Sequence, residues 1–222
     1  MISSDPHRDA AIYYAGRPLG QSPNAMIMLH GRGSNADNIL SLAPEFQRPQ
    51  WTYLAPHATG NTWYPYPFMP PMQQNEPYLS SALQMIQNIM LRLADVGILP
   101  MNTVILGFSQ GACLATEFAA RHAQLYGGIV GLSGGLIGPP GTPRDYEGNM
   151  LGTPVFLGCS DRDDHIPLAR VQETSKVFTQ LGAEVVERIY PAMGHTVNAD
   201  ELANVTALLD RVAAAPTDSS SV

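Results

Sequence analysis

The sequence has few cysteines and few charged residues. Only two cysteines, Cys113 and Cys159, occur among 222 residues, and neither stands in Cys-x-x-Cys or zinc-ligand spacing. No disulfide framework is indicated, and we expect both side chains to be small buried apolar fillers. Charged residues make up 14% and hydrophobic residues 45%, which favours one compact domain with a large core. We therefore predict a single domain over residues 1–222, with a frayed tail at about residues 214–222.

Positive charge and long apolar runs are also scarce. The net charge is −7 and the isoelectric point about 5.2, so the overall field repels phosphate backbones and anionic lipid headgroups. Nucleic acid and a stable membrane association are therefore not expected. No run reaches the roughly 18 apolar residues that span a bilayer, and residues 1–10 contain no apolar core of signal-peptide length. We expect a soluble cytoplasmic protein, either a monomer or a homodimer.

Apolar runs alternate with helical patterns along the chain. The runs predict strands at residues 11–15, 24–30, 51–56, 102–108, 127–133, 154–159 and 183–190. Helical patterns occupy residues 36–47, 78–95, 110–122, 167–181 and 198–213. Gly182 is expected to cap the helix before it, and Asn198 or Asp200 to begin the last one. Strands separated by helices form βαβ units, so we predict the α/β class, with a mostly parallel sheet and helices on both faces.

The motif Gly-Phe-Ser-Gln-Gly at residues 107–111 lies between an apolar run and an alanine-rich helical stretch. In a strand–turn–helix of this kind, the serine occupies a sharp, strained corner and its hydroxyl projects from the sheet edge. Gly107 and Gly111 lack the Cβ atoms that would collide where the strand and the helix approach each other. The motif therefore predicts that Ser109 is a nucleophile.

A serine hydroxyl needs a base within hydrogen-bond reach and a carboxylate that fixes the tautomer of the base. Both should come from loops at the carboxyl ends of later strands, because these ends line the edge where Ser109 lies. Three aspartates within residues 161–164 follow the sixth predicted strand, and His195 follows the seventh. The order serine, aspartate, histidine is the order of the nucleophile-elbow fold. We therefore predict a triad of Ser109, one of these aspartates and His195.

These segments resemble the α/β-hydrolase fold and, within it, the phospholipase/carboxylesterase family, which includes acyl-protein thioesterases. The resemblance covers about residues 24–209 and rests on Leu-His-Gly-Arg-Gly at 29–33, Gly-Phe-Ser-Gln-Gly at 107–111, Asp-Asp-His-Ile-Pro at 163–167 and Gly-His at 194–195. The family's acid stands in Asp-x-x-Val-Pro, so the resemblance selects Asp163, with Ile166 in place of valine. It also implies an oxyanion hole formed by the backbone N–H groups of Arg32 and Gln110, and the helix dipole behind Ser109 would support it.

The arginine at position 32 departs from the small or apolar residue expected in thioesterases. Its side chain either recognises a polar or anionic group of the substrate or is simply solvated at a loop tip. Among the other histidines, His30 and His57 are expected to order loops, and His7 and His122 to be solvated. His165 lies near Asp161 and Asp164, but no second histidine stands at ligand spacing, so we expect no metal.

The stretch at residues 60–77 interrupts the alternation of strands and helices. It carries five prolines, many aromatic and methionine side chains and almost no charge. It either covers the edge of the core or forms a lid or wall over an apolar site. We favour the second interpretation, because long loops in compact domains tend to carry function. The residues expected to line the substrate pocket are Trp63, Tyr64, Phe68, Met69, Leu136, Ile137 and Ile166.

Together these features predict a serine hydrolase that cleaves an ester or thioester through an acyl-enzyme, without a cofactor. The expected substrate is a small molecule with a short or medium acyl chain. Lysophospholipase or acyl-protein thioesterase activity is the alternative that the family resemblance implies. A non-catalytic protein of the same fold that binds an apolar ligand is less well supported, since all three triad residue types are present. Peptide cleavage lacks a visible subsite, and a lactonase of the dienelactone type would usually carry cysteine at position 109.

Overall fold

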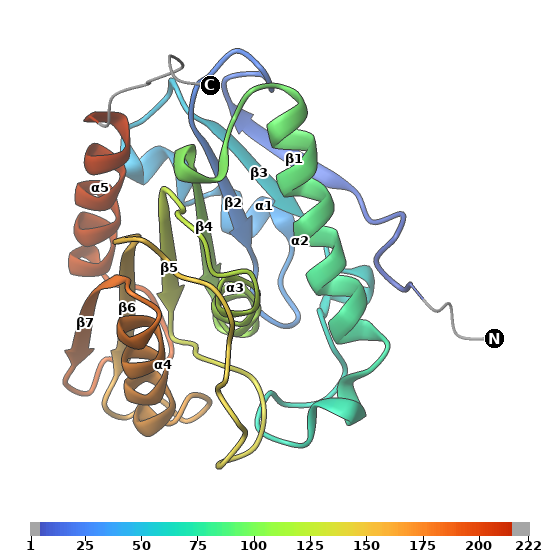
Figure 1. Ribbon diagram of the computed structural model, residues 1–222, viewed down its shortest axis with the longest axis vertical. Coiled ribbons are helices and arrows are strands. Elements are labelled where there is room, and N and C mark those ends of the chain that lie inside the picture. Colours follow the sequence, from blue (N-terminus) through green and yellow to red (C-terminus); the bar gives the residue numbers. More distant parts are fainter. Residues whose placement is uncertain (1–4, 215–222) are drawn as a thin grey trace.

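The structure, a computed structural model, describes residues 5–214. Within them, seven strands form one sheet in the order β1-β3-β2-β4-β5-β6-β7 (Figure 1). Neighbouring strands pair in parallel, except that β1 runs antiparallel to β3. The strands are β1 (Ile12–Gly16), β2 (Ala25–Leu29), β3 (Thr52–Pro56), β4 (Thr103–Phe108), β5 (Gly128–Leu132), β6 (Pro154–Ser160) and β7 (Glu184–Tyr190).

Helices cover both faces of the sheet (Figure 1). Side chains of α2, α3 and α4 pack in the core on one face, and side chains of α1 and α5 pack in the core on the other. The α-helices are α1 (Ala36–Leu40), α2 (Tyr78–Asp95), α3 (Gln110–Arg121), α4 (Leu168–Gln180) and α5 (Ala199–Ala214). Short 3₁₀ helices lie at Ala43–Phe46, Thr59–Asn61, Met72–Asn75 and Pro100–Asn102.

Three of the interior strands are buried along their whole length. Every residue of β2, β3 and β5 is buried, because helices cover both faces of a parallel sheet. Strand β7 lies at the edge of the sheet, and its residues alternate between exposed and partly buried. Each apolar side chain that is fully buried in this way contributes about 1.5–3 kcal/mol relative to an exposed one. The burial pattern therefore distinguishes the interior strands from β7, and two of the buried strands, β2 and β5, flank β4, which leads into Ser109.

The predicted α/β class with a mostly parallel sheet is confirmed, and each predicted strand end lies within one residue of the observed end. One helix differs. The pattern over residues 36–47 predicts a single helix, but α1 ends at Leu40 and a separate 3₁₀ helix follows. Pro44 explains the break, because its nitrogen carries no hydrogen to donate within a continuing helix.

The two predicted caps are present. Gly182, after α4, has a φ of +82°, and the N–H of Glu201 donates to the Asn198 side chain while the N–H of Asn198 donates to the Glu201 carboxylate. None of the helices within residues 5–214 combines the length and apolar character needed to cross a membrane. Residues 215–222 of the predicted frayed tail lie outside the described part of the chain.

Candidate active site

The corner between β4 and α3 holds Ser109 in a strained conformation. Its φ of +55° lies in the left-handed region, which costs a residue with a side chain about 1–3 kcal/mol. Close packing enforces the corner: a Cβ on Gly107 would lie 2.2 Å from the Gly111 carbonyl oxygen. The N–H of Ser109 donates to the Leu132 carbonyl of β5 at 2.9 Å. The predicted elbow is thus present in the structure, with the Ser109 side chain at the carboxyl edge of the sheet.

Ser109, His195 and Asp163 form a continuous hydrogen-bonded line. His195 Nε2 lies 2.8 Å from Ser109 Oγ, and His195 Nδ1 lies 2.7 Å from Asp163 Oδ2. A carboxylate only accepts hydrogen bonds, so Nδ1 carries the hydrogen and Nε2 is left to accept the serine proton. The three residues follow β4, β7 and β6 respectively. The structure therefore brings together the three residues that the sequence proposes, in an order suited to proton transfer.

The Asp163 carboxylate is held by four groups. Its Oδ1 accepts from the N–H groups of His165 and Ile166 at 2.9 and 3.0 Å, and its Oδ2 lies 4.0 Å from the Cys159 sulfur. Burial by itself raises the pKa of Asp163, but the hydrogen bonds from His195, His165 and Ile166 outweigh it and lower that pKa. Asp163 is therefore an anion throughout the neutral range.

The neighbouring aspartate at position 161 has a different contact. Its Oδ1 accepts from the N–H of Ala192 at 2.7 Å, in the turn that leads to His195. Asp164 is exposed, and among the described residues no group of three or more histidine, cysteine, aspartate or glutamate side chains could hold a metal ion. His165 packs its ring edge-on against His195, with ring centroids 4.7 Å apart. Asp163 is thus the aspartate that contacts His195, and Asp161 shapes the loop beside it.

The two residues proposed for the oxyanion hole come from different elements beside Ser109. Arg32 follows β2 and Gln110 begins α3, and both line the same cavity as Ser109. A Cβ on Gly31 would lie 3.4 Å from the Ser109 Cβ, so the loop after β2 passes directly over the nucleophile. The Arg32 guanidinium donates to the Pro65 and Tyr66 carbonyls at 2.7 and 2.6 Å. Its side chain is therefore bound to the loop at 60–77.

A cavity of about 370 Å³ opens beside Ser109 and His195. Its lining includes three of the predicted pocket residues, Tyr64, Phe68 and Ile166. The other lining residues were not predicted from the sequence. Two of them could have been, because Phe108 is adjacent to Ser109 and Cys113 lies one helical turn after it. The missed residues are Gly31, Ser34, Asn38, Pro67, Phe108, Cys113 and His165.

Four predicted pocket residues do not line this cavity, which corrects the prediction. Trp63 is fully buried, and its indole N–H donates to the His30 carbonyl at 2.8 Å. Leu136 and Ile137 are fully buried in the core below, where their N–H groups donate to Thr174 and Glu117. Met69 packs against the same core. Their apolar side chains suit a pocket wall, but they pack in or against the core instead.

The loop at 60–77 both covers the core and forms a wall of the cavity. Trp63, Tyr64 and Phe68 belong to the core on the α2 side, and Tyr64, Pro67 and Phe68 also line the cavity. The loop is tied down by Asn75, a buried residue whose side chain accepts from the Tyr66 N–H and donates to the Pro67 carbonyl. The loop is therefore both part of the core and a wall of the cavity.

Three of the other histidines, including the exposed His122, follow the prediction and one does not. His30 donates from Nδ1 to the Gly31 carbonyl and accepts at Nε2 from the Ala58 N–H, while His57 bonds the Asn61 side chain. The interpretation of His7 as a solvated residue is wrong, because it is only 1% exposed. Its ring accepts from the Thr59 N–H and donates to the Trp63 carbonyl. The N-terminal segment therefore packs onto the loop that borders the cavity.

A family model described as Phospholipase/Carboxylesterase matches residues 16–213. The crystal structure of a phospholipase/carboxylesterase from Dyadobacter fermentans shares 39% sequence identity and a TM-score of 0.87, and the match covers 90% of this chain and 96% of that one. The structure of esterase PE8, at 23% identity and a TM-score of 0.73 over 91% of this chain and 98% of that one, shows the fold.

Curated relatives match over a shorter stretch. Acyl-protein thioesterase 1 of Saccharomyces cerevisiae is 31% identical over 135 residues, which is 59% of this chain and 59% of that protein. Acyl-protein thioesterase 1 of Gibberella zeae is 31% identical over 127 residues, 55% of this chain and 53% of that protein. The chain thus spans between about half and three fifths of the length of these relatives.

Proposed function

The chain belongs to the phospholipase/carboxylesterase family, and we propose that it is a serine hydrolase that cleaves carboxylic esters or thioesters through an acyl-enzyme. The observation that carries the proposal is the line of hydrogen bonds from Ser109 through His195 to Asp163, at 2.8 and 2.7 Å. Such a line converts a weakly nucleophilic hydroxyl into one that can attack a carbonyl carbon.

The first half of the reaction forms the acyl-enzyme. Ser109 Oγ attacks the carbonyl carbon, and its proton passes to His195 Nε2 across the 2.8 Å hydrogen bond. The carbonyl oxygen gains the negative charge, which the N–H groups of Arg32 and Gln110 stabilise. The imidazolium on His195 is stabilised by the Asp163 carboxylate. When the tetrahedral intermediate collapses, His195 returns the proton to the leaving alcohol or thiol, and the acyl group stays on Ser109.

The second half repeats these roles with water. His195 takes a proton from a water molecule, whose oxygen attacks the acyl carbon, and the same N–H groups stabilise the second oxyanion. The acid leaves when the proton returns to Ser109 Oγ. No cofactor takes part in either half, because every bond change is a proton transfer or an acyl transfer between groups already present.

The lining of the cavity supports short or medium acyl chains and an uncharged or anionic leaving group. Tyr64, Phe68 and Ile166 supply an apolar wall, and the volume of about 370 Å³ is at the small end for ligand sites. Ser34 and Asn38 supply polar groups, Arg32 a positive charge, and none of the described lining residues is a carboxylate. A cationic choline ester therefore finds no opposite charge in the cavity. Lysophospholipids and acylated proteins rank below small soluble esters, since the net charge of −7 disfavours an anionic lipid surface.

A panel of p-nitrophenyl esters from two to sixteen carbons, assayed beside acyl-CoA and choline esters, tests the proposal. We expect the highest kcat/KM among the short and medium chains, and complete loss in Ser109→Ala. A fluorophosphonate probe should label wild-type protein on Ser109 and leave Ser109→Ala unlabelled. A folded wild-type protein that neither reacts with the probe nor hydrolyses any ester would contradict the proposal and favour a non-catalytic binding protein.

A further inference from the structure

Residues 62–66, here called the brace, are bound by the side chain of Gln110. Gln110 Oε1 accepts from the Trp63 N–H at 2.9 Å and from the Thr62 hydroxyl at 3.2 Å, and Gln110 Nε2 donates to the Tyr64 carbonyl at 2.8 Å. The Gln110 side chain is buried, so these bonds are shielded from competition with water. One of the two proposed oxyanion residues is therefore connected to the brace by three hydrogen bonds.

The same five residues are bound to the other proposed oxyanion residue. The Arg32 guanidinium donates to the Pro65 and Tyr66 carbonyls, and the Trp63 indole N–H donates at 2.8 Å to the carbonyl of His30, two residues before Arg32. The N–H of Gly33 also donates at 2.7 Å to the Asn61 carbonyl, directly before the brace. The loop after β2 is therefore joined to the brace at His30 and Arg32, and to the residue directly before the brace at Gly33.

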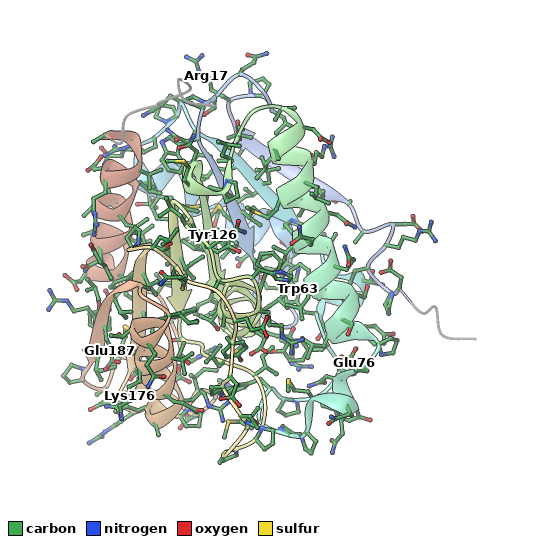
Figure 2. All side chains as sticks on the ribbon, viewed as in Figure 1. Arg17, Trp63, Glu76, Tyr126, Lys176 and Glu187 are labelled. Atoms are coloured by element: carbon green, nitrogen blue, oxygen red, sulfur yellow. The ribbon has the colours of Figure 1, made fainter. Side chains whose placement is uncertain are left out.

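Trp63 is the one brace residue whose own N–H groups reach both donor segments. Its backbone N–H bonds Gln110, and its indole N–H bonds the loop that carries Arg32. The side chain lies in the interior, on the side of the sheet that α2 and α3 cover (Figure 2). It is fully buried and packs against His30 with ring centroids 4.9 Å apart, and its carbonyl accepts from His7 at 2.9 Å. Trp63 thus does not line the cavity, but it is central to the hydrogen bonds around Ser109.

We propose that the brace sets the distance and direction of the two oxyanion donors, with Trp63 as the positioning residue at its centre. This inference rests on the proposed function, because it concerns the same reaction. The donors belong to separate elements, the loop after β2 and the first turn of α3, so their relative placement depends on what joins them. Oxyanion stabilisation depends on donors that are fixed before the charge develops, and a displacement of about 1 Å can cost about 10²-fold in rate.

The substitution Trp63→Phe tests the proposal, because it keeps a buried aromatic ring but removes the indole N–H, together with ring volume that the control below also loses. Trp51→Phe is the matched control. Trp51, the other tryptophan of the chain, is also fully buried, but its indole nitrogen has no hydrogen-bond partner among the described residues. We expect kcat to fall by about 10- to 100-fold in Trp63→Phe with KM within about twofold. Trp51→Phe should keep kcat within about threefold of the wild type.

A second readout separates a displaced oxyanion hole from a general loss of folded enzyme. Sulfur is a weaker hydrogen-bond acceptor than oxygen, so a thionoester gains less from the two N–H donors than the matching oxoester does. Trp63→Phe should therefore lower the ratio of kcat/KM for oxoester to thionoester by about fivefold or more, while Trp51→Phe leaves it unchanged. An unchanged ratio in Trp63→Phe would overturn the proposal, since a reduced folded fraction scales both substrates equally.

Gln110→Met provides an independent variant if Trp63→Phe does not fold. It keeps the backbone N–H of residue 110 and removes all three side-chain bonds to the brace, so the oxoester to thionoester ratio should fall in the same direction. Amide hydrogen exchange supplies a readout that needs no activity. Exchange at residues 30–33 should speed up in Trp63→Phe or Gln110→Met and not in Trp51→Phe. If the wild type hydrolyses no ester, the proposed function fails, and equal exchange in all variants would separately overturn the brace.

Discussion

The two sides of the active site are held by different kinds of interaction. On the side of His195 and Asp163, a carboxylate pairs with an imidazole that is 20% exposed, and both groups lie in loops after edge-side strands. On the side of the brace, Trp63 and His30 are fully buried, and uncharged N–H groups donate to carbonyls and ring nitrogens. The charged guanidinium of Arg32 also donates there, but to backbone carbonyls and not to a carboxylate. The first side contains the groups that exchange a proton in the proposed reaction. The second side contains groups that must keep their protonation state and position during that proton transfer.

Histidine chemistry shows the difference most clearly. His30 and His7 each accept a hydrogen bond from a backbone N–H at one ring nitrogen and lie near a carbonyl at the other, an arrangement open only to the neutral ring. Burial lowers the pKa of both rings, despite the carbonyl contacts, which raise it. His195 instead has its Nδ1 on a carboxylate, which stabilises the protonated ring. The same type of side chain therefore serves as a neutral structural group on one side and as the proposed base on the other.

The largest test of this contrast compares two aspartates of the same loop. Asp163→Asn removes the charge that orients His195 and stabilises its protonated form, so we expect kcat to fall by about 10⁴-fold with the fold intact. Asp161→Asn can still accept a hydrogen bond from the Ala192 N–H, and we expect a loss of less than about tenfold. Steady-state kinetics on one p-nitrophenyl ester, with circular dichroism as the folding control, measures both. Equal losses at the two positions would contradict the assignment of Asp163.

On the brace side, Arg32→Met should have a smaller effect. The variant keeps the proposed backbone donor but loses the two bonds from the guanidinium to the Pro65 and Tyr66 carbonyls, and we expect kcat to fall about tenfold. Arg92→Met is the matched control. Arg32 and Arg92 are both exposed, and each guanidinium carbon lies 5.9 Å from the centre of a tyrosine ring, but the Arg92 contact is with Tyr14, outside the cavity. Similar rates in the two variants would show that the Arg32 contacts do not position the donor.

The neutral histidines predict a dependence of stability on pH. The pKa of His7 in the folded chain lies below its ordinary value of 6.5, so the unfolded chain binds the proton first as the pH falls. The contribution of His7 to the free energy of unfolding is therefore fully present above pH 6.5 and decreases as the pH falls below it. His7→Gln cannot titrate, so its Tm should fall by a few degrees less than that of the wild type between pH 8 and pH 5.5. Calorimetry at both pH values measures this difference, and parallel shifts in the two proteins would exclude His7 as the source.

The sequence allows much of the triad side to be predicted, for a physical reason. Apolar runs separate buried strands from loops, and parallel strands bring their carboxyl ends to one edge, so Ser109 and His195 follow from motif and topology. Asp163 is different, because three aspartates follow the same strand. The choice depends on the turn, in which the N–H groups of His165 and Ile166 both bond Asp163 Oδ1. Only the family resemblance distinguishes Asp163 before that geometry is known.

The brace could not be predicted in the same way. Trp63 bonds His30 and Gln110, which lie 33 and 47 residues away, and no local pattern encodes partners at such separations. By composition alone, an aromatic residue in a proline-rich loop suits a pocket wall as well as a core. The break after α1 is the opposite case, because Pro44 stands in the sequence and a local rule identifies it. Local rules thus describe helix ends and strand burial, and long-range polar contacts decide the rest.

The smallest expected effect concerns Ile166, which replaces the valine of the family's acid motif. Its two parts have separate contacts: the backbone N–H bonds Asp163 and the side chain lines the cavity. Ile166→Val keeps the first and removes one methylene group from the second. Turnover of the best substrate should stay within about twofold, while the preference shifts toward a longer acyl chain by about tenfold. That shift is at the lower end of the about 1–3 kcal/mol that one methylene in an apolar pocket is worth. The ratio of kcat/KM for neighbouring p-nitrophenyl esters measures the shift. A large loss of kcat with no change in that ratio would instead show that the Ile166 side chain helps to position Asp163. The apolar wall of the cavity would then also support the triad.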